Sequence, residues 1–254
     1  MKPEKFSQFM LCTLTALLIM PKNIPAAEPP LTGDRVATKD GDLVIHPLNH
    51  ATLALGWKNL TIYVDPVGGA ARFAGLPRPD LILLTHEHGD HLSADTLKAV
   101  MGEKTAIIAP AAVAGQLSAD LRRPAIVMTN GETKSLLGLT VEAVPMYNTT
   151  PERAKFHPKG NGNGYVLAFG DKRVYLSGDT EDIPEMRALK NIDVAFLCIN
   201  QPYTMTVEQA AGAVREFRPK IVYPYHYRGS DLEKFKKLVG DDAGVEVRLR
   251  DWYK

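Results

Sequence analysis

The sequence predicts an α/β fold in which two mixed β-sheets pack against each other and helices cover their outer faces. From Leu43 onward, short β-branched or apolar runs alternate with polar turns. These runs are more numerous than one sheet usually holds, and amphipathic segments lie between them in the second half of the chain. No interior linker or internal repeat divides the sequence, so we expect one domain.

The strand candidates are short runs bounded by glycine, proline and other turn-forming residues. In chain order they are 43–45, 52–55, 61–64, 81–84, 106–109, 126–128, 139–144, 165–169, 173–176, 194–198, 221–223 and 245–248. The segment Asn161-Gly162-Asn163-Gly164 predicts a turn between two strands, because glycine readily supplies positive φ.

Helix candidates begin behind residues that cap helix N-termini. Ser93 precedes the candidate at 94–101. Thr206, with Gln209 three positions later, forms a capping-box pattern before 207–217. Two further candidates are 111–118, opened by Pro110, and 231–239. Their amphipathic patterns predict helices that pack one face on a sheet.

Residues 1–27 differ from the rest and predict a secretory signal peptide. Lys2 and Lys5 precede an apolar run at 9–20, and Pro25 and the small pair Ala26-Ala27 follow it. The run is shorter than the roughly 18 residues of a membrane-spanning helix, so we expect no stable membrane anchor after cleavage. The layout predicts a bacterial periplasmic or secreted protein whose functional domain is 28–254.

Charge and cysteine content restrict the partners of this domain. The 30 basic and 29 acidic residues nearly cancel, which gives no global field for binding nucleic acid or an anionic membrane. We therefore expect a small-molecule substrate. After signal cleavage only Cys198 would remain, so no disulfide can form within the domain. Its apolar surroundings predict a buried, inert thiol.

A cluster of potential metal ligands follows the apolar strand candidate at 81–84. The run Thr85-His86-Glu87-His88-Gly89-Asp90-His91 brings three histidines and an aspartate to one strand end, just before the helix start at Ser93. Imidazole and carboxylate suit zinc and other borderline divalent ions. A solvated polar loop is the plain alternative, but it does not account for the whole run. The helical zinc-protease pattern fails, because Asp90 stands where its second histidine belongs.

The pattern His86-x-His88-x-Asp90-His91 resembles the signature of the metallo-β-lactamase superfamily. Asn49-His50-Ala51 with Asp65-Pro66 resembles the opening hairpin of its lactonase-like and phosphodiesterase-like branch. Ser177-Gly178-Asp179-Thr180 resembles the family's bridging-aspartate segment, and Pro224-Tyr225-His226 resembles the segment of its last histidine ligand. The resemblance implies a four-layer αββα sandwich. It also implies two divalent metal ions, with zinc expected first and manganese or iron(II) as alternatives.

The resemblance assigns the metal ligands residue by residue. His86 and His88 would bind the first ion, Asp90, His91 and His226 the second, and Asp179 would bridge them.

The remaining ligand of the first ion has two candidates. His157 lies in a His-Pro-Lys-Gly turn similar to that of many family members, and imidazole is a better ligand than an amide oxygen. Asn148 lies where relatives in the phosphodiesterase-like branch carry a histidine. We favour His157; if Asn148 is the equivalent, His157 would face substrate instead.

Three residues are predicted to serve the reaction. Asp90 would orient a metal-bound hydroxide and could carry its proton. His50 could reach the metal cleft as a ligand or substrate contact, although a histidine that closes a turn is an equal alternative. Lys159 neighbours His157 and is the first choice among the loop cations to bind an anionic group of the substrate.

The resemblance and the signal-peptide pattern together predict an exported, dinuclear metal-dependent hydrolase. A metal-bound hydroxide would cleave an ester, lactone or phosphodiester bond of a small substrate. The alternatives are β-lactamase activity and a non-catalytic protein of the same fold that binds metal or substrate.

Overall fold

The computed structural model describes Met1 and residues 30–253, so the predicted signal peptide lies almost wholly outside the described residues. Two seven-stranded sheets form the centre of the molecule. Within the described part of the chain, no helix is both long enough and apolar enough to cross a membrane.

The first sheet contains the first seven strands in chain order. They are β1 (Asp34–Thr38), β2 (Gly41–Asn49), β3 (Thr52–Trp57), β4 (Leu60–Val64), β5 (Leu81–Leu83), β6 (Ala106–Ala109) and β7 (Ala125–Val127). Strands β1 to β4 pair antiparallel, and β4 to β7 pair parallel. The parallel strands direct their carboxyl ends, and the loops that follow, to one edge of the sheet.

The second sheet repeats this arrangement with the rest of the chain. It contains β8 (Thr133–Leu136), β9 (Leu139–Met146), β10 (Gly162–Phe169), β11 (Lys172–Leu176), β12 (Val194–Cys198), β13 (Ile221–Tyr225) and β14 (Glu246–Val247). The first four strands pair antiparallel, and β11 to β14 pair parallel. The two halves therefore share one topology, although the sequence contains no detectable repeat.

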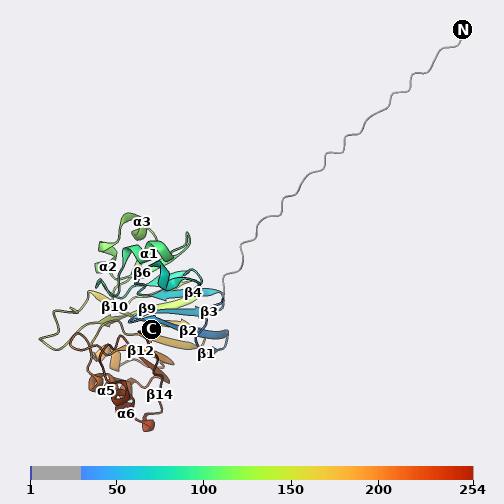
Figure 1. The fold of residues 1–254 in the computed structure, drawn as a ribbon. Helices are drawn as coiled ribbons and strands as arrows, with labels where there is room; N and C mark the ends of the chain where they lie inside the picture. Colours follow the sequence, from blue (N-terminus) through green and yellow to red (C-terminus); the bar gives the residue numbers. More distant parts are fainter. Residues whose placement is uncertain (2–29, 254) are drawn as a thin grey trace.

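Helices cover the outer faces of both sheets (Figure 1). The first half supplies α1 (Ala94–Val100), α2 (Ala111–Gln116), α3 (Ala119–Arg122) and the 3-10 turn η1 (Ala70–Phe73). The second half supplies α4 (Pro184–Arg187), α5 (Val207–Phe217), α6 (Leu232–Val239) and the 3-10 turn η2 (Asp241–Ala243). In Figure 1, α1 to α3 lie on one side of the sheets and α5 and α6 on the other, which confirms the four-layer sandwich.

Apolar side chains fill the space between the sheets and beneath the helices. The main cluster joins residues of both sheets, such as Leu53 and Leu83 from the first and Leu167 and Phe196 from the second. A second cluster packs α1 and α2 against the first sheet through Leu97, Ile107 and Val113. Burial of this surface stabilises the scaffold that carries the loops at the strand ends.

The helix caps agree with their sequence patterns. Ser93 Oγ accepts a hydrogen bond from the Thr96 backbone N–H, and Thr206 and Gln209 form a reciprocal capping box. Pro110 occupies the N-cap of α2 without a side-chain hydrogen bond, since it has no polar side-chain atom.

Two strands and one turn were not foreseen correctly. Strands β1 and β8 bury few side chains, so their sequences lack the apolar signal of the other strands. The turn predicted at 161–164 is wrong, because Gly162 already opens β10. A Cβ atom on Gly162 would lie 2.5 Å from Met146 Cε, and one on Gly164 would lie 2.8 Å from the Leu176 backbone oxygen. These glycines permit close packing within the sheet.

Candidate metal centre

The predicted metal ligands come from loops that follow different strands. The run 85–91 follows β5, Asp179 follows β11, and His226 follows β13. His157 lies on the long loop between β9 and β10. Two hydrogen bonds tie the second sheet to the start of this loop. Tyr165 Oη donates to the backbone oxygen of Leu84, just before the loop, and the Asn163 N–H donates to the backbone oxygen of Thr85. The two halves of the fold thus meet at this point.

The carboxylate of Asp179 lies at the centre of the histidines. Asp179 Oδ1 is 3.4 Å from His91 Nε2, and Oδ2 is 3.4 Å from both His157 Nε2 and His226 Nε2. His86 Nε2 lies 4.0 Å from Oδ2 and 3.1 Å from His88 Nδ1. Asp90 Oδ2 lies 3.4 Å from His226 Nε2 and 3.9 Å from His91 Nε2.

These separations fit ligands that share a metal ion better than they fit hydrogen bonds. Good N–H···O bonds are shorter than 3.4 Å. Two ligand atoms each about 2.1 Å from one tetrahedral ion lie roughly 3.4 Å apart. Within the described part of the chain, buried atoms without a hydrogen-bond partner include His91 Nε2, His157 Nε2, His226 Nε2 and Asp179 Oδ1. Buried polar atoms rarely lack a partner, so this donor set suits bound cations.

Three groups of side chains have ligand atoms close enough to hold an ion. One is His86, His88 and His157; another is His86, His91 and Asp179; the third is His50, Asp90 and His226. The residues predicted for the first ion therefore lie together. Of the residues predicted for the second ion, Asp90 and His226 group with His50, whereas His91 groups with His86 and Asp179.

Burial and neighbouring charges set the protonation of the cluster. Burial, reinforced by His91, holds the pKa of His86 well below its usual range. Burial also lowers the pKa of His88. These neutral rings keep a lone pair for a metal. Burial opposes ionisation of Asp179, yet His226 and His91 outweigh it and hold the pKa of that carboxyl well below its usual range. Asp179, the residue predicted to bridge two ions, therefore carries a negative charge.

His157 and Asn148, the two candidates for one ligand position, are neighbours in the fold. Asn148 Nδ2 donates to the backbone oxygens of Arg153 and Tyr203 at 3.0 and 2.7 Å, and it lies 3.2 Å from His157 Nδ1. The other ring nitrogen of His157 is the atom beside Asp179. Asn148 thus contacts the far side of the His157 ring.

Asp65 is a residue of this centre that sequence reasoning did not assign to it. Its buried carboxylate accepts hydrogen bonds from the backbone N–H and hydroxyl of Thr85 at 2.8 and 2.6 Å, and it lies 2.8 Å from His91 Nδ1. It thereby fixes both the start of the loop and the His91 ring, whose Nε2 faces Asp179. Its position in the sequence could have indicated this role, because Asp65 directly follows β4, the parallel neighbour of β5.

The C-terminal segment holds His50 beside Asp90. His50 Nε2 lies 3.1 Å from Asp90 Oδ2, and His50 Nδ1 lies 2.8 Å from the Tyr253 hydroxyl. The His50 backbone binds both Trp252 and His226, and the His50 and His226 rings are 3.6 Å apart. Both histidines have positive φ, 55° and 47°. Such backbone strain gathers where a structure fixes a functional side chain.

Hydrogen bonds also set the charge of Asp90. Its side chain is 50% exposed. Burial of the rest opposes ionisation, but the neighbouring His226 ring and the hydrogen-bonded His50 hold the pKa of the carboxyl well below its usual range. Asp90 is thus an ionised carboxylate at the open side of the cluster.

Glu181 braces the loop that carries His157. Its buried carboxylate accepts hydrogen bonds from the backbone and hydroxyl groups of Thr149 and Thr150 and forms a 2.6 Å ion pair with Arg153. Removal of one partner leaves buried polar groups without a partner.

We expect Glu181→Ala to lower the free energy of unfolding by ~3 kcal/mol. Urea denaturation of the metal-free protein measures this change. The exposed Glu152 of the same loop gives a matched control, and Glu152→Ala should stay within about 0.5 kcal/mol of wild type. Equal stability of the two variants would contradict the bracing role.

The lysine and arginine side chains near the site form ion pairs or lie over aromatic rings. Lys159 Nζ lies 2.9 Å from Glu185 Oε1 and 3.2 Å from the Tyr147 hydroxyl. Arg153 pairs with Glu181. Lys155 lies over the Phe156 ring and Arg228 over the Tyr253 ring, at 5.2 and 5.3 Å. The role predicted for Lys159 toward an anionic substrate stays a prediction.

A pocket of about 340 Å³ opens over the cluster. It is lined by His88, Asp90, Phe156, His157, Asp179, Asn200, Tyr203 and His226. Its volume lies at the small end of the range for ligand sites. Cys198, buried at the end of β12, does not line it, and burial raises the pKa of this thiol to about 12. Both findings agree with an inert thiol.

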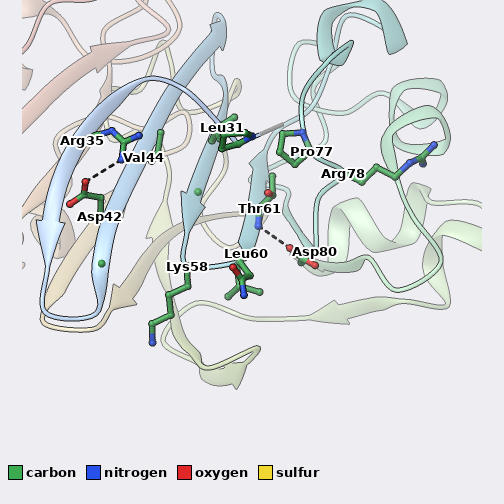
Figure 2. Close-up of a pocket in the computed structure, with 14 residues that line it drawn as sticks. Leu31, Arg35, Asp42, Val44, Lys58, Leu60, Thr61, Pro77, Arg78 and Asp80 are labelled. Atoms are coloured by element: carbon green, nitrogen blue, oxygen red, sulfur yellow. Dashed lines mark hydrogen bonds and ion pairs between the residues drawn. The ribbon is translucent and has the colours of Figure 1, made fainter. Parts of the chain in front are cut away.

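A larger cavity of about 620 Å³ lies away from this chemistry, beside β1 to β4 (Figure 2). Arg35 and Asp42 on its wall form an ion pair at 3.1 Å, and Asp80 accepts a hydrogen bond from the Thr61 N–H at 2.8 Å. None of the candidate metal-binding groups found among the described residues lines it. The pocket of about 340 Å³ is therefore the candidate site, because it joins a cavity of ligand size to convergent ligand atoms.

Comparisons with known proteins identify the family of the chain. A model described as the β-lactamase superfamily domain matches residues 61–227. A protein of Pyrococcus horikoshii named a metal-dependent hydrolase is 34% identical over 73% of this chain and 88% of its own length. One of Deinococcus radiodurans with the same name is 30% identical over 82% of this chain and 96% of its own.

Solved structures show the same fold. The crystal structure of a protein from Parabacteroides distasonis, also named for metal-dependent hydrolysis, has a TM-score of 0.80 and 45% sequence identity. The match covers 88% of this chain and 99% of that one. Igni18, a metallo hydrolase from Ignicoccus hospitalis, has a TM-score of 0.69 at 22% identity, over 84% and 96% of the two chains, which is a likeness of fold. The matches to family, relatives and structures together show that the chain belongs to the metallo-β-lactamase superfamily, among its metal-dependent hydrolases.

Proposed function

We propose that this protein is an exported dinuclear hydrolase that cleaves an ester, lactone or phosphodiester bond of a small substrate. The observation that carries the proposal is the set of ligand atoms around Asp179. Three histidine nitrogens lie 3.4 Å from its two carboxylate oxygens, and these nitrogens have no hydrogen-bond partner within the described chain. One carboxylate between histidines on both sides suits a bridge between two cations.

The first ligand set is one of the groups described above, and the second keeps the assignment made from the family resemblance. His86, His88 and His157 would hold one ion, Asp90, His91 and His226 the other, and Asp179 both. Mixed imidazole and carboxylate donors favour zinc, and they also accept manganese or iron(II). Two such ions would lower the pKa of a water molecule toward ~7 and stabilise negative charge at the scissile group.

The chain's own residues would orient the reactants. Asp90 is ionised, half-exposed and lines the pocket, so its carboxylate can accept a hydrogen bond from a water molecule there and orient it. His50 contacts the Asp90 carboxylate through Nε2, and the Tyr253 hydroxyl holds the His50 ring in place through Nδ1. Asp65 fixes the His91 ring. No side-chain nucleophile is required, which agrees with the inert thiol of Cys198.

Export rests on the composition of residues 1–27. Their basic start, apolar run and small residues before 28 match a secretory leader. Cell fractionation with an antibody to the protein would test it, since the mature form should collect in the periplasm or medium. An uncleaved protein in the cytoplasm would contradict export.

Metal analysis joined to a substrate panel tests the hydrolase. Protein purified without added metal should bind about two divalent ions per chain. It should hydrolyse at least one of bis-p-nitrophenyl phosphate, an aryl ester and a homoserine lactone, and a chelator should abolish the turnover. Turnover of nitrocefin alone would instead indicate a β-lactamase. Bound metal without turnover of any substrate would favour a non-catalytic binding protein.

A further inference from the structure

The pocket wall beside the metal cluster is aromatic. Apart from the predicted ligands, its lining consists of Phe156, Asn200 and Tyr203. No lysine or arginine of the described chain contributes to this lining. Of the cations near these residues in sequence, Arg153 and Lys159 are paired with Glu181 and Glu185. The exposed Lys155 places its Nζ 5.2 Å from the centroid of the Phe156 ring but does not line the pocket.

Phe156 and Tyr203 form a single surface, which we call the aromatic wall. Their ring centroids lie 5.1 Å apart with an interplanar angle of 78°, an edge-to-face pair. Tyr203 is 45% exposed and Phe156 is partly buried, so both rings retain apolar surface that a ligand could cover.

Backbone hydrogen bonds fix this wall relative to the cluster. The Tyr203 N–H donates to the Asn200 oxygen at 2.9 Å, and the Tyr203 oxygen accepts from Asn148 Nδ2 at 2.7 Å. Asn148 in turn contacts the His157 ring. Phe156 directly precedes His157, and its N–H donates to the Arg153 oxygen. These bonds hold the backbone of Phe156 and Tyr203 in place beside His157.

Asn200 supplies the polar part of the wall. Its hydrogen bonds within the described chain all use the backbone: the N–H donates to Thr204 Oγ1, and the oxygen accepts from Tyr203 and Thr204. Its partly exposed side-chain amide can therefore bind a carbonyl or ether oxygen.

We propose that the aromatic wall selects substrates whose group next to the scissile bond is flat, apolar and uncharged, such as neutral aryl esters or small lactones. A second anionic group on this wall would lose hydration against the two rings, and the pocket lining contains no lysine or arginine to pair with it, so its burial costs free energy. In the reaction, water adds to the acyl carbon and the C–O bond breaks, giving a carboxylate, a proton and the alcohol or phenol. This inference rests on the proposed function and narrows it.

Hydroxamate binding tests the wall without turnover. Acetohydroxamate reports on the metals, because hydroxamates chelate divalent ions. Phenylacetohydroxamate adds a neutral ring, and its 4-carboxy derivative adds a charge. By calorimetry on the zinc-loaded protein, we expect the phenyl compound to bind about tenfold more tightly than acetohydroxamate. The carboxylate should remove most of this gain.

Variants test whether the aromatic wall causes the tighter binding of the phenyl compound. Tyr203→Ala should reduce the ratio of phenyl to acetyl affinity to about threefold or less, and Tyr203→Phe should preserve it. Phe156→Leu gives an independent second variant with the same expectation as Tyr203→Ala. The control is Leu238→Ala, an exposed apolar residue on α6, which should leave all three affinities unchanged.

The outcomes separate this inference from the proposed function. Equal binding of the acetyl and phenyl compounds, or tightest binding of the carboxylate, would overturn the aromatic wall. The expected ratios without hydrolysis of phenyl acetate would leave the wall supported and the hydrolase proposal refuted for esters. Failure of acetohydroxamate itself to bind would refute the metal centre, and with it both proposals.

Discussion

Replacing Asp179 with asparagine is expected to lower kcat/KM on the order of 10³-fold or more and to reduce the bound metal below two equivalents. The substitution keeps the size of the side chain but removes the negative charge between His91, His157 and His226. An amide oxygen is a weak ligand and cannot offset the charge of two cations.

Steady-state kinetics and elemental analysis measure the two effects together. Asp171→Asn, the same substitution in the surface turn between β10 and β11, is the control and should change neither quantity. Circular dichroism of the metal-free variant should show an unchanged fold. If Asp179→Asn kept both metals and most of its activity, the carboxylate would not be the bridge.

The second large effect separates His157 from Asn148. His157→Ala should reduce the metal content from two equivalents to one, because it removes the Nε2 atom beside Asp179. Asn148→Ala should keep two equivalents under saturating metal. Its affinity for the first ion should fall about 10–100-fold, the usual effect of losing a group that orients a ligand.

Competition with a chromogenic chelator measures both affinities on matched variants. Turnover of the best substrate should fall more in His157→Ala than in Asn148→Ala. The reverse pattern, with one ion lost only in Asn148→Ala, would make the amide the ligand and His157 a contact for substrate.

Local sequence signals predicted most of the scaffold. The apolar runs gave the buried strands, and the Ser93 and Thr206 patterns gave the starts of α1 and α5. Strand β8 could not be found this way, because its side chains are largely exposed and its pairing with β9 is what makes it a strand. Gly162 and Gly164 suggested a turn because glycine is ambiguous: it permits positive φ, and it also permits close approach within a sheet.

Some residues of the candidate site could also be predicted from local sequence, and others could not. The run 86–91 is contiguous, so its potential ligands are visible in the sequence. Asp65 acts across neighbouring parallel strands, and Tyr253 reaches His50 from the far end of the chain. Such contacts depend on topology and register, which no local pattern encodes. The ion pair between Lys159 and Glu185 belongs to the same class.

Anomalous diffraction from crystals grown with zinc tests the central claim most directly, because it locates each ion. We predict two peaks, one among His86, His88 and His157 and one among Asp90, His91 and His226, with Asp179 between them. A single peak, or peaks away from Asp179, would contradict the dinuclear centre.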